Sequence, residues 1–369
     1  MSGIYLHIPF CKSKCAYCNF FSVVSEKQRI DFLEALKKEA VERKDYLGGE
    51  EVRTVYFGGG TPSLLKPSEI AGILEVLYKN YKIIENPEIT LEANPDTVSK
   101  ESLSELKSLG INRLSVGIQS FCDDDLQYLS RKHDSRHARR VLDWAQEVGF
   151  QEVTMDLIYG IPTLTDEKWH RNLETFFATG INHLSAYALT VEEKTALGQR
   201  INKGVAAPVD EDAVIRQYQI LVEMTENQGF EHYEISNFAR PGHYSKHNTI
   251  YWKGEKYLGL GPSAHSFDGV SRQWNVASVK DYCESYSFER EELTLNDRYN
   301  EYIMTSLRTM WGVDLEHIRK EFGENYSERF KKAIKKYIFE GKIYQKDQKF
   351  VLNDDGMLFA DGIAAELFI

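Results

Sequence analysis

The sequence has few cysteines, a deficit of positive charge and no long hydrophobic run. Its 369 residues contain only 5 cysteines, too few for a fold held together by disulfides. No apolar run approaches the roughly 18 residues that a membrane-spanning helix requires. Residues 1–10 also lack the basic start and the long apolar stretch of a secretory signal. We therefore expect a cytoplasmic protein with no integral membrane segment.

The charge balance argues against nucleic acid as a partner. Lys and Arg total 45 against 56 Asp and Glu, which gives a formal net charge of −11. A protein that covers nucleic acid with a broad surface needs the opposite sign. Residues 317–350 are locally basic, but their lysines form adjacent pairs that are typical of a solvated helix face. We expect no nucleic-acid partner.

Residues 1–190 alternate between strand-like and helix-like patterns. Short apolar runs rich in β-formers lie at 4–8, 54–57, 89–92, 113–116, 152–157 and 183–188. Amphipathic stretches with helical spacing lie at 26–46, 68–80, 99–109, 135–147 and 166–179. Six such units predict parallel strands joined by crossover helices. The predicted class is α/β, with a partial (β/α)6 TIM-like barrel over residues 1–190.

Two further segments follow the predicted barrel. Residues 191–290 contain one predicted helix, 210–228, and a glycine- and aromatic-rich stretch at 229–269, and we interpret them as an accessory segment. Within 291–369, predicted helices at 297–310, 315–322 and 327–340 precede a hairpin at 342–353. Helices followed by a hairpin predict a small winged-helix-like α+β domain at the C-terminus.

Three of the five cysteines form a C-x3-C-x2-C cluster directly after the first predicted strand, at Cys11, Cys15 and Cys18. Structural zinc normally takes four protein ligands, whereas the remaining Cys122 and Cys283 are isolated from the cluster and from each other. Three thiolates suit a 4Fe–4S cluster with one iron left open to an external ligand. The alternative is a zinc site completed by a histidine such as His7.

Five further motifs each follow or end a predicted strand. They are HIPFC at 7–11, GGGTP at 58–62, EANP at 92–95, GIQS at 117–120 and DLIYGIP at 156–162. Together with the cysteine cluster, they resemble the radical S-adenosylmethionine (SAM) superfamily, in the branch that contains oxygen-independent coproporphyrinogen III oxidase and the heme chaperones. The resemblance covers essentially the whole chain. It implies a 4Fe–4S cluster on the three cysteines, and SAM on the open iron in a pocket lined by Tyr5, Gly59, Gly60, Thr61, Glu92, Gln119, Arg131 and Asp156.

Independently of the resemblance, the residue types in these motifs are suited to binding SAM. All the motifs lie at the carboxyl ends of predicted strands, where (β/α) barrels carry their active sites. The glycines of 58–60 leave the backbone open to close approach by a ligand. Arg131 can pair with a carboxylate, and Glu92 or Asp156 can accept hydrogen bonds from ribose hydroxyls or an ammonium group.

Two sequence features distinguish the oxidases of this branch from the present sequence. In the oxidases, a further cysteine stands two residues after the third cluster cysteine, and a longer segment precedes the motif. Here Phe20 occupies that position and ten residues precede Cys11. The resemblance therefore implies a heme chaperone that binds haem and passes it to an acceptor protein. Oxidative decarboxylation of coproporphyrinogen III through a 5′-deoxyadenosyl radical is the alternative, so the enzyme question stays open.

Residues 247–252 read HNTIYW and match the H-N-x-x-Y-W motif of the heme-chaperone group. Histidine is a common axial ligand of haem iron, aromatic rings offer flat faces, and Lys246 and Lys253 can meet propionates. The resemblance implies a haem site formed by His247 as first ligand candidate, with Tyr251, Trp252 and His265. The alternative is that this segment covers the barrel mouth, with His247 facing the SAM pocket.

The chaperone interpretation implies three cofactors and two kinds of partner. The cofactors are a 4Fe–4S cluster, SAM and haem. The partners are an acceptor haem protein and an electron donor such as a flavodoxin or a ferredoxin. Apolar groups within residues 1–25 also suggest a homodimer promoted by cluster binding.

Overall fold

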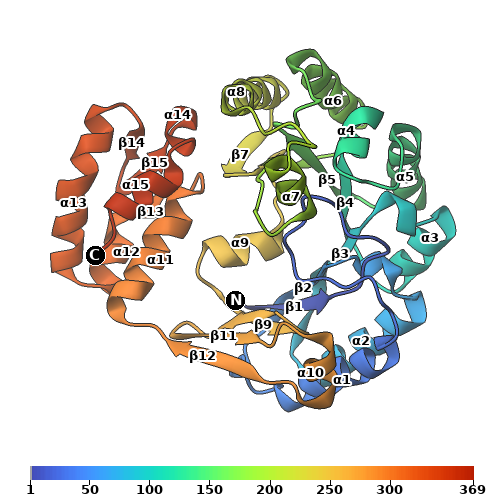
Figure 1. Cartoon of the computed structure of the whole chain (residues 1–369). Coiled ribbons are helices and arrows are strands. Elements are labelled where there is room, and N and C mark those ends of the chain that lie inside the picture. Colours follow the sequence, from blue (N-terminus) through green and yellow to red (C-terminus); the bar gives the residue numbers. More distant parts are fainter. Residues whose placement is uncertain (1) are drawn as a thin grey trace.

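The computed structural model describes residues 2–369, and its central feature is a parallel sheet. Six strands lie in it in sequence order, as predicted (Figure 1): β1 (Ser2–Ile8), β2 (Val52–Gly59), β3 (Ile83–Ala93), β4 (Arg113–Gln119), β5 (Glu152–Tyr159) and β6 (His183–Ala188). Every residue of β4 is buried, as expected for a parallel sheet that is covered on both faces. The prediction of a partial α/β barrel is confirmed.

The predicted crossover helices cover the outer face of this sheet (Figure 1): α1 (Arg29–Glu42), α2 (Pro67–Asn80), α3 (Lys100–Ser108), α5 (Ser135–Val148) and α6 (Asp166–Ala178). Helix α5 illustrates why the sequence forms a helix here that packs on the sheet. Asp134 caps its first turn by accepting from the His137 backbone N–H, and Gly149 ends it with a φ of 91°. Its buried residues form one stripe along the helix, at Ala138, Val141, Leu142 and Ala145.

Smaller elements lie between these strands and helices, outside the predictions. They are two short 3-10 helices, Pro62–Leu64 and Pro95–Thr97, and helix α4 (Asp123–Tyr128). All three begin within a few residues of the end of a strand, on the side where the sequence motifs lie. They shape the loops at the carboxyl ends of β2, β3 and β4.

Residues 191–290 extend the sheet at both edges. β7 (Glu231–Glu234) and β8 (Asn237–Ala239) add antiparallel strands beyond β6. At the other edge, β9 (Lys256–Leu260) runs parallel to β1 and leads to β10 (His265–Phe267), β11 (Ser271–Asn275) and β12 (Phe288–Glu292). These strands have only three to five residues, too few to show a period, which is why the sequence does not predict them.

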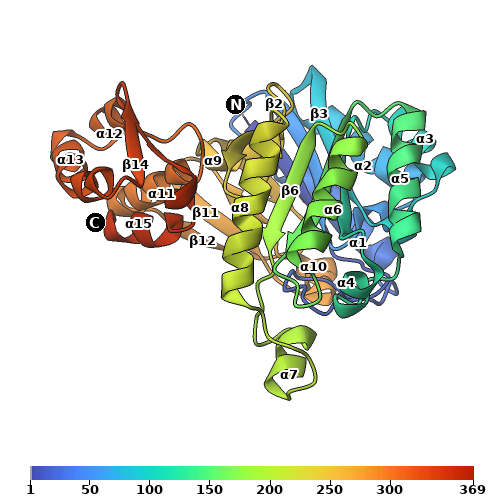
Figure 2. The same cartoon turned by 90° about the horizontal axis from the view of Figure 1, so that it is seen from above.

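Four helices accompany these strands: α7 (Ala196–Asn202), α8 (Glu211–Asn227), α9 (Lys246–Trp252) and α10 (Val279–Ser285). Helix α8 confirms the predicted helix at 210–228. Helix α7 projects from the body of the barrel, whereas α9 lies between the barrel and the C-terminal part of the chain (Figure 2).

The C-terminal part has the predicted order of helices and hairpin. Helices α11 (Leu295–Leu307), α12 (Leu315–Glu321) and α13 (Glu324–Phe339) precede the hairpin of β14 (Ile343–Lys346) and β15 (Lys349–Leu352). β13 (Val313–Asp314) joins that hairpin, and α14 (Asp354–Met357) and α15 (Ala360–Glu366) complete the unit. None of the helices between residues 2 and 369 is long and apolar enough to span a bilayer.

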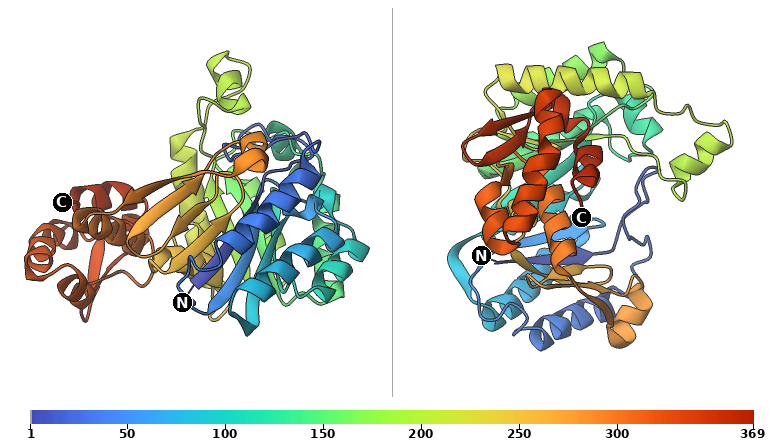
Figure 3. Two further views of the ribbon diagram at one scale, coloured as in Figure 1. Left: turned by 90° about the horizontal axis from the view of Figure 1, so that it is seen from below. Right: turned by 90° about the vertical axis from the view of Figure 1, so that its left-hand side faces the viewer.

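The C-terminal unit contacts both edges of the barrel sheet. It stands beside the barrel in the left view of Figure 3 and in front of it in the right view. On the β7 side, Ile235 donates a backbone hydrogen bond to the Arg308 carbonyl at 2.9 Å. On the β11 side, Arg272 pairs with Glu301 of α11 at 2.8 Å. These contacts fix residues near 308–311 against the end of the barrel where the chain begins.

Candidate functional site

The three clustered cysteines lie on a loop that follows β1 and is held at several points. Cys11 donates its backbone N–H to Val23 at 2.9 Å, and Ala16 donates to Leu129 at 3.2 Å. Gly60, directly after β2, packs closely against the start of this loop, because a side chain on Gly60 would lie 2.7 Å from the Phe10 carbonyl oxygen. The glycine is therefore needed for the close contact between the two motifs.

The three thiols are close enough to influence one another, and two of them accept hydrogen bonds. Burial raises the pKa of Cys18, and the neighbouring Cys15 and Cys11 raise it further. Thr61 donates to Cys11 Sγ at 3.5 Å, and Arg131 donates to Cys15 Sγ at 3.3 Å. Thiols crowded together in this way are stabilised as thiolates when a metal centre neutralises them.

The described residues, 2–369, contain no group of three or more His, Cys, Asp or Glu side chains arranged around a single ion. A 4Fe–4S cluster needs a different arrangement, because each thiolate binds a separate iron. His7 is already engaged on both sides: its Nδ1 is hydrogen-bonded to the Tyr5 hydroxyl at 3.1 Å and its Nε2 to the Phe21 carbonyl at 2.9 Å. These bonds disfavour the zinc alternative that would use His7 as fourth ligand.

Glu92 and Asp156 are half-buried carboxyl groups close enough to influence each other's pKa, near the cysteine loop. The Glu92 carboxylate accepts from the Tyr56 hydroxyl at 2.8 Å and from the Gly59 backbone N–H at 3.1 Å. Burial raises the pKa of Glu92 to about 7, and Asp156 contributes to the rise. Burial likewise raises the pKa of Asp156 to about 6, although Ser115 donates to it at 3.1 Å. Such a pair accepts hydrogen bonds from a cationic or hydroxyl-bearing ligand.

Arg131 connects the cysteine loop with the third and fourth strands. It donates to Asn94 Oδ1 at 2.8 Å and to the Gly117 carbonyl at 2.6 Å, in addition to Cys15. Asn94 in turn donates to Thr61 Oγ1 at 3.1 Å. Gln119 has a φ of 70°, an uncommon value for a residue other than glycine, and is almost fully buried beside this network.

The structure thus brings most of the predicted SAM residues together toward the carboxyl ends of β2 to β5. Tyr5 instead lies in the middle of β1, paired with Tyr56, and its ring centroid is 6.4 Å from that of His247. Four further residues interact with the predicted SAM residues and are not among those that the sequence motifs predict. Tyr56 and Ser115 lie in strand interiors and carry no local signal, whereas Asn94 and Tyr17 stand inside motifs that were recognised. Asn94 and Tyr17 could therefore have been predicted from their positions within the EANP and C-x2-C motifs.

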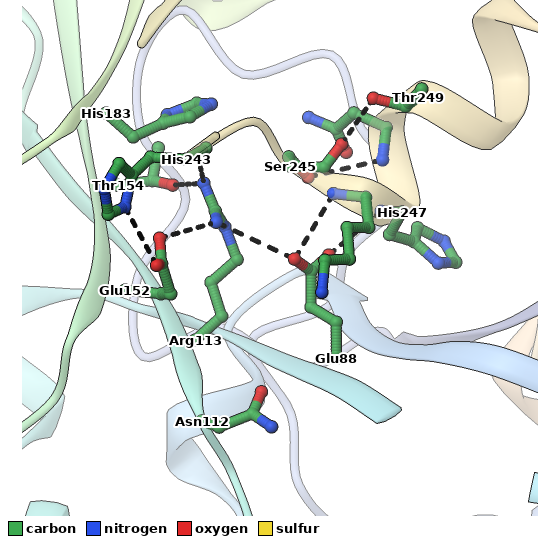
Figure 4. Close-up of polar contacts among 12 residues, drawn as sticks. Glu88, Asn112, Arg113, Glu152, Thr154, His183, His243, Ser245, His247 and Thr249 are labelled. Carbon is green, nitrogen blue, oxygen red and sulfur yellow. Dashed lines mark hydrogen bonds and ion pairs between the residues drawn. The ribbon is translucent and has the colours of Figure 1, made fainter. Parts of the chain in front are cut away.

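Helix α9 closes the opposite end of the barrel, where the strands begin (Figure 4). Its first turn is capped by Ser245, which accepts from the Asn248 backbone N–H. The buried Glu88 of β3 accepts from the backbone N–H groups of His247 at 2.9 Å and of Lys246 at 3.3 Å. A carboxylate at this position stabilises the positive end of the helix dipole.

A buried arginine, Arg113, lies at the same end of the barrel and connects several of these residues (Figure 4). Arg113 of β4 donates to Glu152 at 3.2 Å, to Thr154 Oγ1 at 3.2 Å and to the His243 carbonyl at 3.2 Å. Its distance to Glu88 is 3.7 Å. Because burying an unpaired charge is costly, the two carboxylates and the arginine depend on one another to hold α9 in place.

The predicted haem residues are not gathered in one place. His247 is 1% exposed, and its ring is hydrogen-bonded to Thr54 through Nδ1 at 2.7 Å and to Tyr251 through Nε2 at 2.9 Å. His265 is exposed and lies near the carboxyl end of β9, on the cluster side of the sheet. Trp252 lies against Arg308, whose guanidinium is 5.9 Å from the ring centre.

Comparison with known proteins agrees with this geometry. The sequence model of the Radical SAM superfamily matches residues 5–176, and the HemN C-terminal domain model matches residues 293–359. The fold is similar to that of a solved structure, coproporphyrinogen III oxidase (HemN) from Escherichia coli, described as a radical SAM enzyme. The TM-score is 0.86 at 23% identity, over 100% of this chain and 90% of that one. Fold, cysteine loop and motifs define a protein of the radical SAM class.

Two relatives of known name identify the family within the radical SAM class to which the chain belongs. The heme chaperone HemW of Bacillus subtilis is 31% identical over 98% of both chains. The heme chaperone HemW of Mycobacterium tuberculosis is 32% identical over 99% of this chain and 94% of its own. The chain therefore belongs to the HemW family.

Proposed function

We propose that this protein is a haem chaperone of the cytoplasm, which binds a 4Fe–4S cluster, SAM and haem and transfers haem to an acceptor protein. The observation that carries the proposal is the nearly end-to-end similarity to proteins named heme chaperones. Phe20 supports it, because its side chain is 70% exposed where the oxidases of this branch have a further cysteine. An electron donor and a homodimer are further predictions of the same proposal.

The residues at the cluster end fit the two proposed small-molecule groups. Cys11, Cys15 and Cys18 would hold the cluster, which when reduced supplies the electron for radical chemistry on SAM. Arg131 is positioned to pair with the ligand carboxylate, while Glu92 and Asp156 accept hydrogen bonds from its polar groups. The chain itself binds and orients the ligand and excludes water, and the two carboxyls hold or release a proton near neutral pH.

Haem binding is assigned to His247 as iron ligand. In the present arrangement both ring nitrogens are hydrogen-bonded, so ligation requires His247 to leave Thr54 and Tyr251. A neutral imidazole is the form that binds iron, and burial lowers the pKa of His247 to about 3. The ring is therefore neutral in its present buried position, before it is released.

An anaerobic haem titration tests the proposal, with Soret absorbance as the readout. Wild type is compared with His247→Ala and with a control, His170→Ala, which removes an exposed histidine of α6. We expect saturable one-to-one binding in wild type and control, and in His247→Ala a weaker binding without the Soret change that ligation by histidine produces. Absence of saturable binding in wild type would sink the chaperone proposal. Product analysis with coproporphyrinogen III, SAM and a reductant would then test the decarboxylase alternative.

A further inference from the structure

Helix α9 presents two different faces. The inner face holds His247 and Tyr251 inside the barrel, where their side chains are hydrogen-bonded to each other. The outer face carries Lys246, Thr249, Ile250 and Lys253, which follow the spacing of one helical stripe. The two faces of the haem motif therefore point to different surroundings: the His247 ring is enclosed, whereas the outer face lines a pocket.

A pocket of about 460 Å³ opens along that outer face. Its other walls come from the start of β2, the start of β3 and the C-terminal unit, through Arg53, Ile84 and Trp311, with Tyr244 beside them. A volume of this size falls within the range of roughly 300–1,000 Å³ that small-molecule sites occupy. The pocket therefore forms only where the barrel, α9 and the C-terminal unit meet.

The chemistry of the lining is unusual for this chain. Arg53, Lys246 and Lys253 contribute three positive groups against one carboxylate, Glu255, in a protein whose net charge is −11. The Lys253 ammonium lies 4.7 Å from the ring centre of Trp311. Cationic groups beside exposed aromatic faces suit a flat ligand with more than one carboxylate.

We propose that this pocket is a docking site for the porphyrin ring and its carboxylates, separate from the atom that binds the iron. The proposal rests on the haem-chaperone function proposed above and specifies how the ligand is recognised. The lining contains no histidine, methionine or cysteine, so recognition by it does not require iron. Thr54 lines the pocket and is hydrogen-bonded to His247, so a docked porphyrin lies next to the residue that must be released.

Titration with iron-free protoporphyrin IX, followed by its own fluorescence, tests the proposal on the full-length protein. The test variant is Lys246→Glu with Lys253→Glu, which reverses two charges of the pocket. The control is Lys332→Glu with Lys335→Glu, which reverses two exposed charges of α13 far from the pocket lining. We expect the test variant to raise the Kd for iron-free porphyrin at least tenfold, and the control to leave it unchanged. His247→Ala is expected to keep this binding, and to bind haem no more tightly than iron-free porphyrin.

The outcomes separate the two proposals. Binding of haem but not of iron-free porphyrin by wild type overturns the docking pocket and leaves the chaperone function standing. Binding of neither ligand overturns the chaperone function. Equal weakening in the test and control variants shows general charge attraction and also overturns the pocket. Both lysine pairs are solvent-exposed, so loss of folding does not complicate the comparison.

Discussion

The imidazole of His247 stacks on the phenol ring of Tyr56, with ring centroids 4.9 Å apart and an interplanar angle of 25°. Tyr56 donates to Glu92, and Glu92 accepts from the Gly59 backbone. Two glycines make this stack possible. A side chain on Gly3 would collide with Thr54, and one on Gly58 would collide with the tyrosine rings. The helix at one end of the barrel is therefore connected through side chains to the predicted SAM loop at the other end.

Replacing Thr54 by Val should speed haem binding. The change removes the hydrogen bond to His247 Nδ1 but keeps the shape of the side chain. A hydrogen bond of this kind contributes about 1 kcal/mol, so we expect roughly a fivefold faster association of haem and a similar loss of folding stability. Stopped-flow absorbance after mixing with haem measures the rate, and urea denaturation measures the stability.

The control for this experiment is Thr90→Val. Thr90 is also buried in a strand, but its hydroxyl has no hydrogen-bond partner among the described residues. Its replacement should change neither the haem association rate nor the stability by a comparable amount. If Thr54→Val binds haem at the wild-type rate, release of His247 does not limit ligation.

Replacing Glu92 by Gln should flatten the pH dependence of stability. Burial raises the pKa of Glu92 from an ordinary 4.5 to about 7. Between these pH values the folded protein holds a proton that the unfolded chain has lost, so the free energy of unfolding falls as the pH rises. The effect of this one group is about 3 kcal/mol between pH 4.5 and 7. Denaturation at several pH values, compared between variant and wild type, measures it.

Glu234→Gln provides the comparison for that measurement. Burial raises the pKa of Glu234 to about 7 as well, but this residue lies in β7 and is not a predicted SAM residue. It reaches Asp156 only indirectly, through Asn237 and Ser185. Both variants should lose part of the pH slope, whereas only Glu92→Gln should weaken SAM binding. A SAM affinity that is equal in the two variants would contradict the assignment of Glu92 to the SAM pocket.

The sequence predicts the barrel well because its strands and helices are long enough to show their periods. The buried stripe of α5 and the continuous burial of β4 are examples. It cannot predict that α9 closes the barrel, because the contacts that place it join distant residues. Glu88 and His247 are 159 positions apart, and Thr54 and His247 are 193 positions apart. The sequence motifs predict the SAM residues. The contacts of Tyr56 with His247 and Glu92 depend on packing across strands, which no motif indicates.

Replacing Cys15 by Ser should abolish assembly of the cluster. Three thiolates leave one iron open, and with only two the cluster is held too weakly to persist. We expect the broad visible absorption of the anaerobically reconstituted protein to disappear. Cys283→Ser is the control, because Cys283 is half-buried within α10 and belongs to no cysteine group. Full absorption in Cys15→Ser would contradict the assignment of the cluster to this loop.

Replacing Gly60 by Ala should displace the cysteine loop without touching a cysteine. The added methyl group would lie 2.7 Å from the Phe10 carbonyl oxygen and 2.9 Å from that of Ile8, and neither backbone atom can move freely. Overpacking of this kind costs about 1–3 kcal/mol, and cluster content measured as iron per chain should fall. Gly72→Ala in α2 is the control, since its added methyl group meets only the flexible end of Lys37. The control should be slightly stabilised, by about 0.5–1 kcal/mol, and should keep its full iron content.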